Sequence, residues 1–175
     1  MGLDISAHSK IELIEQIDAD TWYDKYGDDG SITYIYDCTD AEHASRTAGV
    51  TVGAAYRING ESHGFRAGSY SGYNEWRNDL AVLMLGVPAS AVWGDTAAYA
   101  DKPFYELIDF SDCEGVIGPV VAAKLARDFA EHQHKADAYQ DQEGGPNYSD
   151  YWRRKYADWR KAFELAADNG FVSFA

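Results

Sequence analysis

Residues 50–85 read VTVGAAYRINGESHGFRAGSYSGYNEWRNDLAVLML, and they predict two strands followed by a helix. Val50–Ile58 is rich in β-branched and aromatic residues, and Asn59-Gly60 is a tight-turn dipeptide that reverses the chain into residues 61–65. Ser69 or Ser71 then provides the N-cap of a helix. Gly86 and Pro88 end this helix, whose apolar residues recur at helical spacing: Tyr73, Trp76, Leu80, Leu83 and Val87.

The flanking sequence extends this order of strands and helices. Residues 3–15 alternate as one strand, residues 31–36 form another, and residues 39–49 are polar and form a loop or a short helix. Helices are predicted from Pro119 to about Ala138 and from about Ser149 to Asn169-Gly170, before a last strand at residues 171–174. The predicted fold is therefore α+β. We expect one globular domain, residues 1–175, in which an antiparallel sheet is packed on one face by about three helices.

Charge and composition exclude several classes of protein. The 29 acidic residues outnumber the 15 basic ones, and the net charge of −14 excludes direct nucleic-acid binding, which needs a basic face. Hydrophobic residues make up 46% of the chain, which is too many for a disordered acidic tail. The sequence has neither an apolar run long enough to cross a membrane nor a secretory signal, so a cytoplasmic location is expected.

The charge is unevenly distributed along the chain. Residues 1–48 contain 11 acids and 3 bases, a balance of −8, whereas residues 49–99 contain 4 acids and 3 bases. An anionic ligand would therefore meet least repulsion in the middle third of the chain. Cys38 and Cys113 are too few for a zinc site or a disulfide framework, and His132 and His134 point apart on a helix. We expect no cofactor and no resident metal.

The segment of residues 63–77 joins a predicted strand to a well-marked helix through a loop of small residues. Such a loop exposes backbone N–H groups at the positive end of the helix dipole, which favours an anion. Arginines add charge, serines add hydroxyl donors, and aromatic rings add stacking surfaces. The candidate ligand-binding residues are Arg66, Ser69, Tyr70, Ser71, Tyr73, Trp76 and Arg77. The alternative interpretation is a turn and a capped helix whose arginines pair with surface acids.

The segment of residues 110–119 also leads into a helix, and its acids lie just before the helix begins. Asp112 and Glu114 are candidates to accept hydrogen bonds from sugar hydroxyls, or to hold a divalent cation together with Asp109. The alternative is that acids near a helix start complement its dipole. The ligand hypothesis requires the two segments to converge, with Arg66 and Glu114 lining one cavity.

Four blocks of the sequence carry a resemblance to a family. They are MGLDI at residues 1–5, GFRAGSY at residues 64–70, FSDCEG at residues 110–115, and the ending at residues 163–174. Together they resemble a family of uncharacterised proteins encoded by bacteriophages and prophages. The resemblance implies a genomic setting and the host cytoplasm, and it carries over neither a mechanism nor any catalytic residue. Small phage accessory proteins often inhibit host defence, so it also suggests that role.

Three functions follow as hypotheses. The leading one is a non-enzymatic accessory protein that binds a small anionic, nucleotide-like ligand and thereby sequesters a host defence signal. The second is an acidic inhibitor that mimics nucleic acid and binds a basic groove on a host nuclease or defence complex. The third is a metal-dependent phosphodiester hydrolase that uses Asp109, Asp112 and Glu114. The expected partner is a small anionic ligand or a host protein, and the sequence leaves oligomerisation open.

Overall fold

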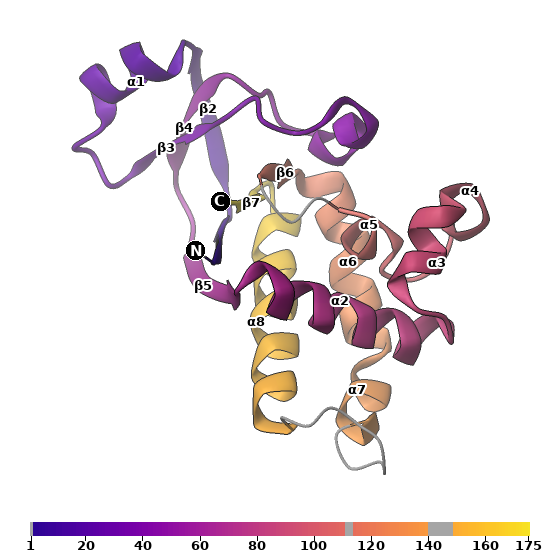
Figure 1. Cartoon of the computed structure of the whole chain (residues 1–175). Coiled ribbons are helices and arrows are strands. Elements are labelled where there is room, and N and C mark those ends of the chain that lie inside the picture. Colours follow the sequence, from indigo (N-terminus) through magenta and orange to yellow (C-terminus); the bar gives the residue numbers. More distant parts are fainter. Residues whose placement is uncertain (1, 111–113, 140–148) are drawn as a thin grey trace.

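The computed structural model describes residues 2–110, 114–139 and 149–175, and it has an α+β fold (Figure 1). Its strands form two sheets rather than the single sheet that the sequence predicts. The larger sheet has the order β5–β1–β7–β6, with bounds Ser62–Gly68, Leu3–His8, Phe171–Phe174 and Gly115–Ile117. The smaller sheet has the order β2–β4–β3, with bounds Ile11–Gln16, Ala54–Ile58 and Ile32–Ile35. The strand pairs described in both sheets are antiparallel.

The chain passes between the two sheets at two neighbouring places: between β1 and β2, and between β4 and β5. The stretch predicted as one strand, residues 3–15, is divided into β1 and β2 because Lys10 adopts a left-handed backbone with φ of 52°. Asn59 and Gly60 lie beside this bend, where the backbone N–H of Asn59 donates to the carbonyl of Lys10 at 3.1 Å. A side chain at position 60 would collide with Ser9. The dipeptide therefore connects two sheets, and the predicted hairpin between β4 and β5 is wrong.

The three predicted helices are present, and one of them is divided into two helices. Helix α2 begins after the N-cap Ser69 and ends at Gly86, which has φ of 73°. The predicted helix from Pro119 is interrupted at His132 and forms α6 and α7. None of the described helices combines the length and apolar composition that a membrane crossing requires. The helices have the bounds α1 Ala19–Tyr26, η1 (a 3₁₀ helix) Ala41–Thr47, α2 Tyr70–Leu85, α3 Ala89–Gly94, α4 Thr96–Tyr99, α5 Tyr105–Ile108, α6 Pro119–Glu131, α7 Gln133–Tyr139 and α8 Ser149–Ala167.

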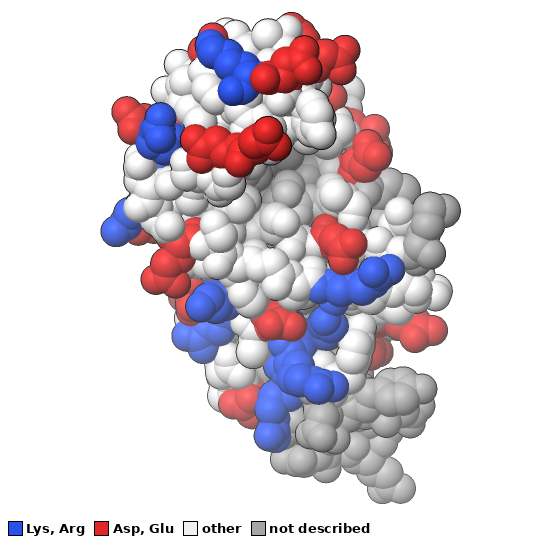
Figure 2. Space-filling model, turned by 90° about the vertical axis from the view of Figure 1, so that its left-hand side faces the viewer, with Lys and Arg blue, Asp and Glu red and all other residues white. Residues whose placement is uncertain are grey.

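Charge is distributed unevenly over the surface. Figure 2 shows acidic side chains concentrated over the upper part of one face, where α1 and the smaller sheet lie, and basic side chains over the lower part, where α8 lies. Helix α1 buries none of its residues, so it is held at the periphery of the fold. On the lower part, the ammonium group of Lys155 donates to the backbone carbonyl of Arg66 and so joins α8 to β5.

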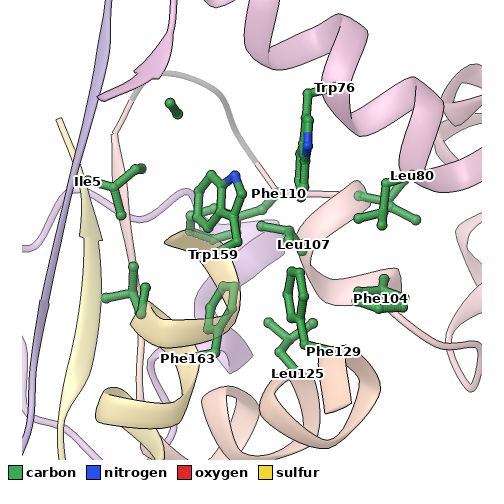
Figure 3. Close-up of a cluster of buried hydrophobic side chains, with 14 of the residues drawn as sticks. Ile5, Trp76, Leu80, Phe104, Leu107, Phe110, Leu125, Phe129, Trp159 and Phe163 are labelled. Carbon is green, nitrogen blue, oxygen red and sulfur yellow. The ribbon is translucent and has the colours of Figure 1, made fainter. Parts of the chain in front are cut away.

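The main core lies between the larger sheet and helices α2, α6 and α8 (Figure 3). The predicted helical stripe of Trp152, Trp159 and Phe163 is buried to 99% or more, which confirms it as core. Trp159 stacks on Trp76 of α2, with ring centroids 5.7 Å apart. The rigid packing of these rings fixes the position of α2, and thereby the site that its side chains help to build.

Candidate functional site

Arg66 and Glu114 lie at opposite edges of the larger sheet. Arg66 is in β5, Glu114 directly precedes β6, and β1 and β7 lie between these two strands. Three strand spacings separate the edges by roughly 14 Å. Both side chains are exposed, and among the described residues no cavity includes the two. The structure therefore does not bring Arg66 and Glu114 into one cavity. Asp112 lies outside the described residues.

The end of β5 and the start of α2 form what we call the surface junction, made of Arg66, Ser69, Tyr70 and Ser71. The Ser69 hydroxyl accepts a hydrogen bond from the Gly72 N–H at 3.1 Å and lies 3.0 Å from the Ser71 hydroxyl, so the helix end is capped from within. The Arg66 guanidinium is 60% exposed and 4.0 Å from the Asp4 carboxylate. Tyr70 is half-buried against the main core. This geometry matches the alternative of a capped helix with a surface ion pair.

Two of the predicted stacking residues belong to the core. Tyr73 is completely buried and Trp76 is 3% exposed. Trp76 packs against both Trp159 and Trp152, with centroid distances of 5.7 and 5.6 Å. A ligand ring could not reach the faces of these side chains without opening the core. We therefore correct the predicted stacking role of Tyr73 and Trp76, because their helical spacing reflects core packing.

The two segments do meet, through Arg77 rather than Arg66. The Arg77 side chain is buried and donates to the backbone carbonyls of Ile108 and Phe110 and to the side-chain carbonyl of Asn74. Its guanidinium also lies 5.2 Å from the ring of Trp93, in α3. Arg77 thus ties α2 to the end of α5, and both segments line one cavity there.

We call this hollow the polar cavity; its volume is about 520 Å³. Five helical elements contribute to its wall, namely η1 with its N-cap, α2, α3, α4 and α5 with the residues that follow it. Most of the lining side chains are polar or aromatic. They are Asp40, Glu42, His43, Asn74, Arg77, Trp93, Thr96, Tyr105, Asp109 and Phe110.

A buried ion-pair network forms one side of the polar cavity. The Asp109 carboxylate lies 3.2 Å from Nη2 of Arg46 and 3.5 Å from Nε2 of His43. The three side chains are between 8 and 12% exposed. The Arg46 guanidinium lies 5.0 Å from the ring centroid of Tyr105, which also lines the cavity. Burial strengthens these interactions, so the network holds η1 firmly against the end of α5.

Three buried nitrogen atoms around this network have no hydrogen-bond partner among the described residues. They are Nδ1 of His43, Nε of Arg46 and Nε of Arg77. Buried polar groups in folded proteins are nearly always satisfied by protein, water or a ligand, because leaving one unsatisfied costs about 1–3 kcal/mol. Two of the three atoms belong to lining residues of the polar cavity, His43 and Arg77, and the third belongs to Arg46, which pairs with the lining residue Asp109.

Trp93 provides an aromatic wall for the polar cavity. Its indole Nε1 donates to the carbonyl of Ile108 at 2.9 Å, which fixes the orientation of the ring. The side chain nevertheless remains 46% exposed. A fixed and partly exposed ring is suited to contact with a flat group of a ligand.

The sequence does not identify the cavity residues in the polar stretch of residues 39–49, nor Trp93 and Thr96. In a 3₁₀ helix, side chains three residues apart lie on one face, so His43 and Arg46 both reach Asp109. Their i, i+3 spacing is a local signal only once the 3₁₀ helix is known. The sequence indicates Asp109 as a metal ligand beside Asp112 and Glu114, whereas in the structure it pairs with Arg46 and His43.

Comparison with protein families, with curated proteins and with solved structures found no match for the chain. The polar cavity combines buried cationic groups, a carboxylate pair at η1 and one aromatic wall.

Proposed function

We propose that this protein binds a small anionic, nucleotide-like ligand in the polar cavity. The observation that carries the proposal is the buried, unpartnered Nε–H of Arg77, which lines the cavity, together with that of Arg46, whose guanidinium pairs with the lining residue Asp109. An anionic oxygen satisfies such a donor and is attracted by its charge. The sequence predicts the same kind of ligand at the surface junction, whereas we propose that it binds in the polar cavity.

The local charge supports an anion on the side of the cavity where Arg77 and Asp109 lie. Arg77 lines the cavity, and Arg46 offsets the charge of Asp109 by pairing with it at 3.2 Å. Asp40 and Glu42, by contrast, are exposed. A phosphate group would therefore lie at the guanidinium side, and the exposed carboxylates would accept hydrogen bonds from sugar hydroxyls.

The aromatic wall and the size of the cavity support a ligand with a flat ring. Trp93 is held in place by its hydrogen bond to Ile108 and offers exposed ring surface. Cavities for molecules of drug size usually have volumes of about 300–1,000 Å³. The volume of about 520 Å³ is thus adequate for one mononucleotide or for part of a cyclic dinucleotide.

A thermal-shift panel of mononucleotides, cyclic dinucleotides and their unphosphorylated nucleosides tests this function. We expect a phosphorylated compound to raise the melting temperature and its nucleoside to do so less, because binding to the folded state alone stabilises it. Trp93→Ala should weaken binding at least tenfold. Tyr23→Ala removes another exposed aromatic side chain, far from the lining residues, and should bind normally.

Arg66→Ala separates the two candidate locations of the ligand. It should leave affinity unchanged if the ligand binds in the polar cavity, because Arg66 is not among the lining residues. No thermal shift at millimolar concentration of any compound would contradict the proposal. Equal affinities of Trp93→Ala and the unmodified protein would contradict it too.

A second candidate function is the binding of a basic protein partner by the acidic end of the molecule. It is favoured by α1, which buries no residue and carries Tyr23 with 70% of its surface exposed, in a region rich in acidic side chains (Figure 2). An exposed aromatic residue among carboxylates is suited to a basic groove. Inhibition of host defence would be one consequence, and it remains a hypothesis.

Inhibition of a panel of DNA nucleases at 50 and 300 mM salt tests this second function. An acidic competitor should inhibit strongly at low salt and weakly at high salt, because ions screen exposed charges. Tyr23→Ala should lose inhibition and Trp93→Ala should keep it, which is the reverse of the ligand-binding result. Inhibition that does not change with salt would contradict the hypothesis.

A further inference from the structure

Three side chains at one end of the polar cavity form a group suited to a metal ion. Asp40, Glu42 and His43 each offer one ligand atom, and the three atoms lie within 4.8 Å of one another. Asp40 is the N-cap residue of η1, but its carboxylate makes no capping hydrogen bond and remains available. Two carboxylates and one imidazole thus face the same small volume.

His43 gives an independent indication of a ligand at this place. The residue is 93% buried, since its exposed fraction is 7%, and its Nδ1 has no partner among the described residues. Its Nε2 lies 3.5 Å from the Asp109 carboxylate. When Nε2–H points at that carboxylate, Nδ1 carries the free lone pair. Histidines that bind metals usually present one nitrogen to the ion while the other donates to a carboxylate.

We propose that Asp40, Glu42 and His43 bind one divalent transition-metal ion, Zn²⁺ or Mn²⁺. In this arrangement Asp109 is a positioning residue, which holds the His43 ring and its tautomer without touching the ion. Imidazole favours transition metals over Mg²⁺ and Ca²⁺, and the carboxylates are compatible with both Zn²⁺ and Mn²⁺. Three protein ligands leave at least one coordination position open to an oxygen from outside the chain.

This inference rests on the proposed function and makes its ligand more specific: the metal ion, rather than sugar hydroxyls, becomes the partner of Asp40 and Glu42. Asp40 and Glu42 would repel an anion if they were left uncompensated. A divalent ion neutralises their two charges and attracts a phosphate oxygen. In this arrangement the phosphate lies between the ion and the guanidinium groups of Arg46 and Arg77. The ligand class is accordingly a phosphate ester that binds with its metal ion.

Titration calorimetry of the metal-free full chain with ZnCl₂ and with MnCl₂, without any organic ligand, tests the site. We expect one equivalent to bind with a dissociation constant in the micromolar range or below. Asp40→Asn and Glu42→Gln change exposed side chains, and each should weaken binding at least tenfold. Glu114→Gln, an exposed carboxylate outside the polar cavity, is the matched control and should bind as the unmodified protein does.

Long-range ¹H–¹⁵N spectra of the His43 ring test the geometry and the role of Asp109. Zn²⁺ should shift the Nδ1 resonance and leave Nε2 protonated. In Asp109→Asn the preference for that tautomer should fall, which a merely structural role of Asp109 would not cause. Zinc binding through Nε2 would overturn the proposed arrangement.

The ligand panel repeated with and without a chelator separates the two proposals. A nucleotide that binds equally well in EDTA, with no metal binding by calorimetry, overturns the metal site and keeps the proposed function. Stoichiometric metal binding sensitive to Asp40→Asn, with no response to any nucleotide, keeps the metal site and overturns the proposed function. Metal binding unaffected by both carboxylate variants overturns the metal site.

Discussion

The surface junction and the polar cavity both place arginine side chains beside α2, about two turns apart, but in opposite environments. At the surface junction, Arg66 is exposed and its ion pair with Asp4 is long and open to water. At the polar cavity, Arg46 and Arg77 are buried and each has one donor without a partner. An arginine beside a helix does not by itself indicate a ligand-binding site. A buried guanidinium with an unsatisfied donor does, because leaving that donor without a partner costs free energy.

The largest expected effect is that of Asp109→Ala. We expect the free energy of unfolding to fall by about 4 kcal/mol, because the variant leaves the Arg46 guanidinium buried without its counter-charge. Asp4→Ala at the surface junction is the matched control, and it should change stability by less than about 0.5 kcal/mol. Urea denaturation of the two variants measures both values. Similar losses in the two would break the contrast between the regions.

A double variant tests whether the uncompensated charge causes that loss. Arg46→Met combined with Asp109→Ala removes both charges, so it should be more stable than Asp109→Ala alone. If the double variant loses the sum of the two single losses, the charges do not interact and the network is only a packing feature.

The next largest expected effect is the difference in stability loss between substitutions of Arg77 and Arg66. Arg77→Met should lower the free energy of unfolding by about 2 kcal/mol, because it leaves the carbonyl of Phe110 without its charged donor, whereas the carbonyl of Ile108 keeps the donor Trp93. Arg66→Met should cost less than about 0.5 kcal/mol, since its side chain is mostly exposed. Equilibrium unfolding monitored by tryptophan fluorescence compares them directly. An Arg77→Met variant as stable as Arg66→Met would show that water satisfies the Phe110 carbonyl.

A smaller effect is expected within the surface junction itself. Ser69→Ala should cost about 1 kcal/mol, because it removes the acceptor of the Gly72 N–H at the start of α2. Ser71→Ala is the control, because Ser71 contacts only the neighbouring hydroxyl among the bonds described. We expect no measurable change in its denaturation midpoint. Equal losses in both serine variants would mean that the cap depends on the hydroxyl pair and not on Ser69 alone.

The features that the sequence predicted correctly are local ones. Helix α2 begins at Ser69 and ends at Gly86 because a capping hydroxyl and a left-handed glycine act on their immediate neighbours. The aromatic stripe of α8 is buried as its spacing predicts. The division of residues 3–15 was not predictable from alternation, because Ile11 and Leu13 continue in sequence the alternation of β1, although β2 pairs in a different sheet and burial does not alternate along it.

The polar cavity could not be predicted because its parts are distant in the sequence. Arg46 and Asp109 are 63 residues apart, and their burial depends on how η1 packs against the end of α5. Residues 39–49 are polar, which is typical of an exposed segment. By contrast, the serines and glycines near Ser69 resembled an anion-binding loop, since capping and anion binding use the same backbone groups.

The last and smallest expected effect is the pH dependence of stability that Lys155 causes at the edge of the surface junction, where its ammonium group donates to the carbonyl of Arg66. Burial lowers the pKa of Lys155 below its ordinary value of 10.5, and the ion pair with Asp158 opposes this shift only in part. In the window between the lowered pKa and 10.5, the unfolded chain binds more protons than the folded one, so stability rises with pH there. This gain in the free energy of unfolding is lost again as the pH falls through the pKa of Lys155 in the folded state. NMR titration of the Lys155 side chain should give a midpoint below 10.5, and the unmodified protein should gain stability relative to Lys155→Met as the pH rises from that midpoint to 10.5. A midpoint at or above 10.5 would mean that the ion pair with Asp158 outweighs the desolvation of Lys155, and the edge of the surface junction would then contain no destabilised cation.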